Sequence, residues 1–267
     1  MTEVLFNGHA GRLEGRYHQS DNPSAPIALI LHPHPQYGGT MNNKVVYTLF
    51  SCFQKLGFSV LRFNFRSVGR SQGQFEDGPG ELSDATVALD WLQSVNPEAR
   101  QCWIAGYSFG AWIGLQLLMR RPDINNFIAV SPPANEKDFS FLAPCPTSGL
   151  VTQGCIDEIV TPASVTALVK RLNTQRNVSV DYAMVEEGDH MYNNHLVDLY
   201  KIVGNYVIDA MKKKTPAKKR RGRRKKNELE DNDPLLIGAE AEEEADEFED
   251  DFDDVENEEY IDEEEEE

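Results

Sequence analysis

The chain has 267 residues and a formal net charge of −18. Residues 1–211 carry 15 basic and 20 acidic side chains, residues 212–226 carry 11 basic and no acidic ones, and residues 227–267 carry 24 acidic and no basic ones. This distribution excludes a protein that is folded uniformly along its length, because the last two segments combine like charges with little apolar surface. We therefore expect a folded domain in 1–211, a basic disordered segment in 212–226 and an acidic disordered tail in 227–267.

The cysteines and the absence of a long apolar stretch together predict the cellular compartment of the protein. No window reaches the roughly 18 consecutive apolar residues of a membrane helix, and the first residues lack the pattern of a secretory signal. Cys52, Cys102, Cys145 and Cys155 lie in apolar segments without a C-x-x-C pair, which favours buried free thiols. We expect a cytoplasmic protein that does not engage a membrane.

The first half of the domain begins with two short predicted strands, 3–7 and 12–18, separated by Gly8 and Gly11 as in a hairpin. Residues 27–31 form an unbroken apolar run, which is typical of a strand buried on both faces. A helix is predicted over 43–56, with Asn42 or Asn43 as its cap and Gly57 as its stop. A strand over 58–65 and a helix over 81–95 follow.

The second half continues the alternation of strands and helices. Strands are predicted over 102–107, 126–131, 148–153 and 178–185, and helices after Ser108, over 162–173 and over 194–211. This order predicts an α/β fold with a doubly wound, mostly parallel sheet of roughly seven or eight strands and flanking helices. Only 132–147 separates the sixth strand from the seventh, where related folds often insert a lid, so no cap domain is expected.

One pentapeptide indicates chemistry. Gly106-Tyr107-Ser108-Phe109-Gly110 stands between an apolar strand and a helix, which is the arrangement of a G-x-S-x-G nucleophile elbow. Such a turn strains the serine backbone and leaves no room for Cβ atoms at the two glycines. The sequence therefore predicts a sheet of the α/β-hydrolase type with Ser108 as its nucleophile.

A serine hydroxyl needs a base, and the base needs a carboxylate to hold its tautomer. The chain order in α/β-hydrolases is Ser, then Asp or Glu, then His, which leaves His190 and His195 as bases. His190 follows the last predicted strand directly and is preferred, because His195 is expected one turn into the final helix. Asp157 follows the strand 148–153 and is the predicted acid; Glu158 is the alternative, and Asp157 would otherwise cap a helix.

The tetrahedral intermediate of acyl transfer needs two backbone donors, which form the oxyanion hole. The N–H of Phe109 lies at the start of the helix after the serine and supplies one. The second is expected from the loop after strand 27–31. Pro33 and Pro35 have no N–H to donate, so the backbone of His34 is the nearest donor, with Gln36 as the fallback.

Several further side chains are candidates for binding. The His-Pro-His-Pro run has no acidic or cysteine ligand nearby, so we expect no metal and no cofactor. Tyr37 and Tyr107 are candidates for lining the acyl pocket, with ordinary packing as the alternative. Arg66 and Arg70 could bind an anionic substrate group, but stabilising their turn is the preferred interpretation.

These motifs together resemble a group of small α/β-hydrolases without a lid that are similar to dienelactone hydrolases. The resemblance covers about residues 3–211 and rests on the following segments: His32-Pro33-His34-Pro35, Gly38-Gly39-Thr40-Met41, Asn43-Lys44-Val45, Phe63-Asn64-Phe65-Arg66-Ser67-Val68-Gly69-Arg70-Ser71 and the elbow. It implies a triad of Ser108, Asp157 and His190 and an esterase-like activity on small acyl esters. Two departures stand out: Ser67 occupies a position that is usually glycine, and the nucleophile is serine rather than the cysteine of true dienelactone hydrolases.

Two functions follow from the sequence. The first is a serine hydrolase that cleaves a small-molecule ester or thioester through an acyl-enzyme, with a peptidase of the same fold as a variant. The alternative is a binding protein whose tail is the working part, because the basic run from Lys212 to Lys226 can hold nucleic acid or an anionic surface. The acidic tail competes for those cations, so we favour self-association or a solubilising role, with an unknown partner.

Overall fold

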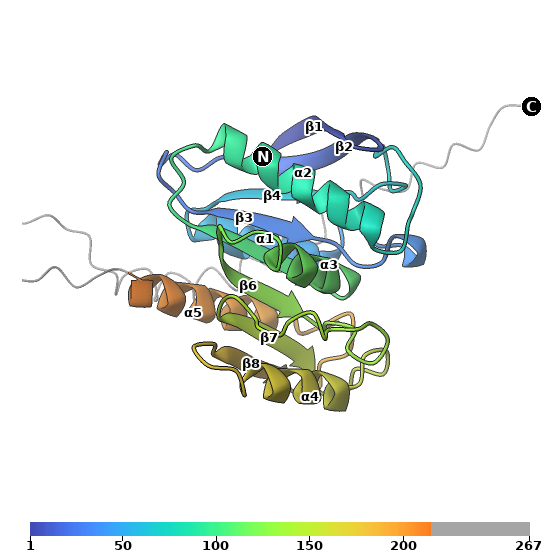
Figure 1. Cartoon of the computed structure of the whole chain (residues 1–267), viewed down its shortest axis with the longest axis vertical. Coiled ribbons are helices and arrows are strands. Elements are labelled where there is room, and N and C mark those ends of the chain that lie inside the picture. Colours follow the sequence, from blue (N-terminus) through green and yellow to red (C-terminus); the bar gives the residue numbers. More distant parts are fainter. Residues whose placement is uncertain (215–267) are drawn as a thin grey trace, which may run out of the picture. The chain divides into compact units, whose positions relative to one another are not determined.

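Eight strands form one sheet in the order β1-β2-β4-β3-β5-β6-β7-β8 (Figure 1). β1 pairs with β2 and β2 with β4 in antiparallel fashion, and all other neighbours pair in parallel. This confirms the expected mostly parallel α/β sheet with an N-terminal hairpin. The strands are β1 (Thr2–Gly8), β2 (Gly11–His18), β3 (Ile27–Leu31), β4 (Ser59–Phe63), β5 (Cys102–Tyr107), β6 (Ile124–Val130), β7 (Gly149–Gly154) and β8 (Val180–Val185).

Helices cover both faces of this sheet. α2, α3 and α4 lie on one face, and α1 and α5 lie on the other (Figure 1). Cys52 Sγ of α1 lies 3.8 Å from the carbonyl oxygen of Tyr200 in α5, so these two helices are in contact. The helices are α1 (Lys44–Lys55), α2 (Pro79–Val95), α3 (Phe109–Leu118), α4 (Pro162–Leu172) and α5 (Leu196–Lys214), and a short 3-10 turn, η1, spans Pro35–Tyr37.

The central strands have no polar face because both sides of the sheet are packed against helices. Every residue of β3, β4, β5 and β7 is buried, because helices cover the sheet on both sides. On the side of α1 and α5, the Trp103 ring meets the rings of Phe53 and Tyr206 at centroid distances of 5.9 and 6.2 Å. Its neighbour Ile104 faces the opposite way, into the cluster beneath α2 and α3.

The computed structural model describes residues 1–214. Met1–Ile208 form one unit by their contacts, and it contains the whole sheet and the candidate active site. The predicted disorder of the basic segment beyond Lys214 and of the tail 227–267 lies outside the described residues. None of the helices in the described part is long and apolar enough to cross a membrane.

The final helix differs from expectation at both ends. Asn194 has a φ of 60°, a left-handed conformation that a helix does not contain, so α5 begins at Leu196. The expectation that His195 lies one turn into this helix is therefore wrong, because His195 precedes it. At its other end α5 continues to Lys214, three residues into the segment expected to be disordered.

The cysteines follow expectation with one exception. Cys52, Cys102 and Cys145 are buried free thiols, and burial raises the pKa of Cys52 and of Cys102 to about 12. Cys155 is also free but exposed, which corrects the expectation of four buried thiols. It follows the last residue of β7, where the chain leaves the sheet for a loop.

Candidate active site

The elbow occupies the turn between β5 and α3. Ser108 has φ 52° and ψ −118°, a strained conformation for a residue with a side chain. A Cβ on Gly106 would lie 2.4 Å from the carbonyl oxygen of Gly110, and a Cβ on Gly110 would lie 2.4 Å from the carbonyl oxygen of Leu31. The two glycines therefore allow the turn to close on itself and the start of α3 to press against the end of β3.

Asp157 and His190 meet at the carboxyl edge of the sheet. His190 Nδ1 lies 2.7 Å from Asp157 Oδ2, and Gln153 Nε2 donates to the same oxygen at 2.8 Å. Asp157 Oδ1 accepts the N–H groups of Ile159 and Val160 at 2.9 and 2.7 Å. The carboxylate is thus held from several sides. Because the Asp157 carboxylate can only accept hydrogen bonds, the proton in its bond to His190 is on Nδ1, and the lone pair of Nε2 is free.

The surroundings of Asp157 keep it ionised. Burial by itself raises the pKa of this carboxyl, but the hydrogen bonds from His190, from the Val160 N–H and from Gln153 outweigh burial and lower the pKa below its ordinary value. The alternative reading as a helix cap does not hold, since Thr161 is the residue that precedes α4.

The other two candidates of the sequence have different surroundings. Glu158 is exposed, and His195 Nδ1 lies 3.0 Å from Asp198 Oδ2 within one turn of α5. Neither residue borders the cavity described below.

Buried tyrosines fix the loop that carries His190. The Tyr107 hydroxyl donates to the carbonyl oxygen of His190 at 2.8 Å. The hydroxyl of Tyr192 lies 3.1 Å from Ser131 Oγ and 3.3 Å from Thr152 Oγ1, and burial raises its pKa to about 12. These bonds anchor the loop to the ends of β5, β6 and β7. Sequence analysis did not find this role of Tyr192, because nothing in the spacing pairs it with those strands.

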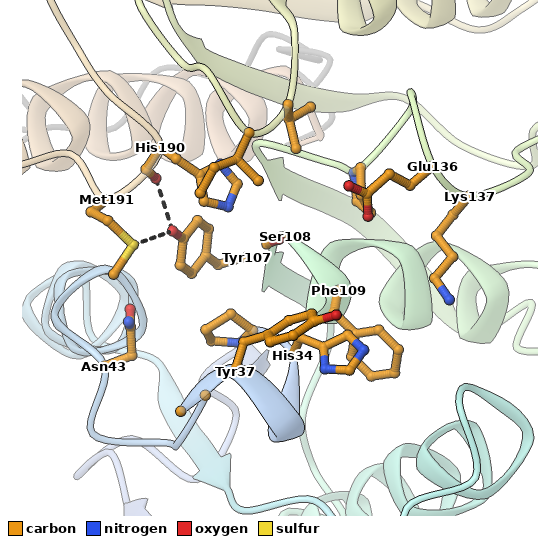
Figure 2. A pocket seen from close by; sticks show the side chains of 16 residues that line it. His34, Tyr37, Asn43, Tyr107, Ser108, Phe109, Glu136, Lys137, His190 and Met191 are labelled. Carbon is orange, nitrogen blue, oxygen red and sulfur yellow. Dashed lines mark hydrogen bonds between the residues drawn. The ribbon is translucent and has the colours of Figure 1, made fainter.

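A cavity of about 240 Å³ opens beside Ser108. Ser108 and His190 both border it, as do Tyr37 and Tyr107 (Figure 2). No hydrogen bond joins the Ser108 hydroxyl to the His190 ring among the described residues; in unliganded enzymes such bonds are often long. Tyr37 is 85% exposed, so its ring forms part of the rim rather than of the core.

Two backbone N–H groups lie free near the serine. In residues 1–214 neither the N–H of Phe109 nor that of His34 donates a hydrogen bond to the protein. The N–H of Gln36, the fallback donor, is donated to His34 Nδ1 at 3.2 Å. The rings of His34 and Phe109 are 5.0 Å apart, so the two segments are in contact.

His32 orients the peptide that carries the His34 N–H. Its Nδ1 donates to the carbonyl oxygen of Pro33 at 2.7 Å, and its Nε2 accepts the N–H of Phe65 at 2.9 Å. Burial lowers the pKa of His32 to about 3, so the ring is neutral. In a trans peptide C=O and N–H point in opposite directions. Holding the Pro33 carbonyl thus directs the His34 N–H the other way, a role that sequence analysis did not find.

In the part of the chain that the structure describes, no three His, Cys, Asp or Glu side chains lie close enough together to hold a metal ion. Both ring nitrogens of His32 are used by backbone groups. The His-Pro-His-Pro run thus serves the backbone geometry of the loop.

Arg66 and Arg70, which flank the turn that contains Ser67, form ion pairs within the fold. Arg66 binds Asp84 through Nε and Nη2 at 2.9 and 2.8 Å and also contacts Glu76. Arg70 Nε binds Glu14 Oε2 at 2.9 Å. Neither arginine borders the cavity, in agreement with the preferred role in stabilising the turn.

Comparison with known proteins gives consistent results. Residues 16–141 match the X-Pro dipeptidyl-peptidase (S15) family. The uncharacterised protein RP471 of Rickettsia prowazekii is 51% identical over 212 residues, which cover 78% of this chain and 89% of that protein.

Two solved structures are similar over most of their length. ATU1826 from Agrobacterium tumefaciens, a protein of unknown function described as an α/β hydrolase, is 54% identical with a TM-score of 0.78, covering 80% of this chain and 98% of its own. XC6422 from Xanthomonas campestris, an α/β serine hydrolase without lid, is 31% identical with a TM-score of 0.71, covering 78% and 94%. This chain, with its eight-stranded sheet and short β6–β7 connection, belongs to the family of small α/β serine hydrolases without a lid.

Proposed function

We propose that this protein is a carboxylesterase-like serine hydrolase that cleaves a small-molecule ester or thioester through an acyl-enzyme. The observation that carries the proposal is the bond between His190 Nδ1 and Asp157 Oδ2, together with the single cavity that both His190 and Ser108 border. Acyl transfer requires a nucleophile, a base beside it and a carboxylate that orients the base. Ser108, His190 and Asp157 match these three requirements. The resemblance to dienelactone-hydrolase-like proteins supports small esters as substrates.

The proposed reaction has two halves. Ser108 Oγ attacks the carbonyl carbon while His190 Nε2 takes its proton, and Asp157 stabilises the imidazolium that forms. The N–H groups of Phe109 and His34 bind the oxyanion. His190 then protonates the leaving alcohol. In the second half a water molecule, deprotonated by His190, attacks the acyl carbon; the bond to Ser108 Oγ breaks, His190 returns the proton to Oγ and the acid is released. Tyr37 and Tyr107 border the space for the substrate.

The test combines turnover of p-nitrophenyl acetate with labelling by a fluorophosphonate probe. Wild-type protein is expected to turn over the ester and to label, whereas Ser108→Ala loses labelling and at least about a thousandfold in kcat, because no nucleophile remains. Ser94→Ala, which changes an exposed serine in the last turn of α2, is the matched control and keeps both properties. Equal labelling and turnover in Ser108→Ala and wild type would refute the proposal.

Peptidase action is the second candidate, and the match of residues 16–141 to the X-Pro dipeptidyl-peptidase family favours it. The same nucleophile and base serve amide and ester cleavage, since fold and triad leave the substrate open. Release of p-nitroaniline from a dipeptidyl X-Pro anilide, lost in Ser108→Ala, would establish it; esterase turnover without any such release would eliminate it.

A role for the charged tail is a separate proposal. We propose that the basic segment 212–226 and the acidic tail 227–267 serve self-association or solubility, with nucleic-acid binding as the alternative. Gel shifts of the full chain against a variant that ends at Asn227 distinguish these. The free cysteines support a cytoplasmic location.

A further inference from the structure

Two neighbouring charged side chains of the β6–β7 loop, Glu136 and Lys137, border the cavity. The charge of Lys137 is already balanced, because its Nζ donates to Asp77 Oδ1 at 2.7 Å and lies 4.8 Å from the centre of the Trp112 ring. The charge of Glu136, by contrast, is not balanced by a partner among the described residues. Its carboxylate is exposed and, within residues 1–214, has no hydrogen bond or ion pair. A negative charge without a partner thus borders the space beside Ser108.

The other groups around the cavity reinforce this negative character. Asp157 does not border the cavity itself but lies directly behind His190, and because its hydrogen bonds lower its pKa it adds a second negative charge. Tyr37 and Phe109 also border the cavity; the Tyr37 ring is exposed, whereas the Phe109 ring is buried and its centre lies 6.0 Å from Lys137 Nζ. A carboxylate and an exposed aromatic ring beside one space are groups that recognise alkylammonium ions. By contrast, an anionic substrate would meet repulsion from Glu136.

The position of Glu136 indicates which part of a substrate it would meet. His190 must protonate the leaving group, so the alcohol part of an ester lies on the His190 side of Ser108. Figure 2 shows Glu136 and Lys137 on the other side of Ser108, across the cavity from His190 and Met191. The acyl part, which stays attached to Ser108 in the acyl-enzyme, extends to that side.

We infer that the cavity accepts esters whose acyl part carries a cationic amine, with Glu136 as the residue that selects it. This inference rests on the proposed hydrolase function. It assigns to the substrate a charge that the triad itself does not require, because the chemistry at the carbonyl is the same for a neutral acyl group.

The experiment uses two p-nitrophenyl esters of the same shape, 4-(trimethylammonio)butanoate and 5,5-dimethylhexanoate, which differ only in charge. Each kcat/KM is divided by the rate of hydroxide hydrolysis, so that inductive effects cancel. Wild type is expected to prefer the cationic ester roughly five- to thirtyfold at low salt, the range for one exposed ion pair plus one cation–π contact. The preference shrinks as salt is added.

Glu136→Gln keeps the shape and removes the charge, so this preference is expected to fall to the roughly two- to fivefold that a cation–π contact alone supplies. Glu98→Gln removes the same charge from an exposed position between α2 and β5, at the other edge of the sheet, and should keep it. Equal wild-type turnover of both esters, or the same loss in the two variants, would overturn the inference while leaving the hydrolase function intact. Absence of turnover with either ester and with p-nitrophenyl acetate would overturn the proposed function itself.

Discussion

Asp157 and Glu158 are neighbours in the chain with opposite surroundings. Asp157 is 4% exposed and accepts four hydrogen bonds, whereas Glu158 is exposed on the surface. The two side chains point apart, as adjacent residues do, so only one of them can reach His190. Substituting each of the two acids in turn therefore tests which of them acts together with His190.

Asp157→Asn is expected to reduce kcat of p-nitrophenyl acetate hydrolysis by about three to four orders of magnitude, because an amide no longer holds the Nδ1–H tautomer of His190. Glu158→Gln, the matched control, should stay within a factor of two. The kinetics are measured on both variants after circular dichroism has shown that they fold. A larger loss in Glu158→Gln than in Asp157→Asn would contradict the role proposed for Asp157.

His32 couples the folded state to pH. Its folded pKa of about 3 lies below the ordinary value of 6.5, so below pH 6.5 the unfolded chain binds a proton that the folded protein does not. This group therefore lowers the free energy of unfolding as pH falls from 6.5 toward 3, by up to about 1.4 kcal/mol per pH unit. Asp157 acts in a lower window: its stabilisation is lost only as pH falls from about 3.9 through its depressed folded pKa.

Urea unfolding between pH 7 and 4.5 tests this assignment. Wild type is expected to lose stability across that range more steeply than His32→Asn, which carries no titrating ring. The slopes are compared, because the variant is also less stable throughout. Parallel slopes for the two proteins would show that His32 is protonated in the folded state.

At the scale of elements, the turn after β4 holds a residue in an unfavourable conformation. Ser67 has φ 66°, a left-handed conformation that glycine adopts at lower cost than a residue with a side chain. Gly69, two residues on, has φ 54°, and a Cβ there would lie 2.1 Å from Glu14 Oε1. The turn thus needs two left-handed residues, and this chain fills one of them with serine.

Ser67→Gly is expected to raise the free energy of unfolding by about 0.5–1 kcal/mol, since it removes the cost of a left-handed Cβ, and to raise the Tm by roughly 1–4 °C. Gly69→Ala should act in the opposite direction, because its Cβ has no space. Calorimetry on both variants measures the effects. A Tm of Ser67→Gly below that of wild type would mean that the serine makes a stabilising contact.

Element boundaries were less predictable than element order. The strands and helices predicted from apolar patterns all exist, but β8 begins two residues later and α5 begins at Leu196. Asn177 and Asn194 both have positive φ shortly before these elements. Apolar periodicity does not report such turns, because it depends on which side chains are buried and not on single backbone angles.

At the scale of the whole molecule, the site draws on the carboxyl ends of β3, β5, β7 and β8. Parallel strands bring all these ends to one edge of the sheet, so residues such as Ser108 and His190 can share a cavity although they are far apart in the chain. The short connection between β6 and β7 leaves that cavity without a lid. It also places Glu136 at its border, where a cap domain would otherwise lie.

The amino-acid sequence alone determined the α/β architecture, the elbow around Ser108 and the order of serine, acid and histidine, because these depend on local patterns and on a topology that few connections satisfy. Only the tertiary structure decided which acid meets His190, that the Gln36 N–H is already donated while that of His34 is free, and that Cys155 is exposed. Each of these depends on the direction of a single side chain or N–H group. That direction is set by packing between segments distant in the chain, which no local pattern records.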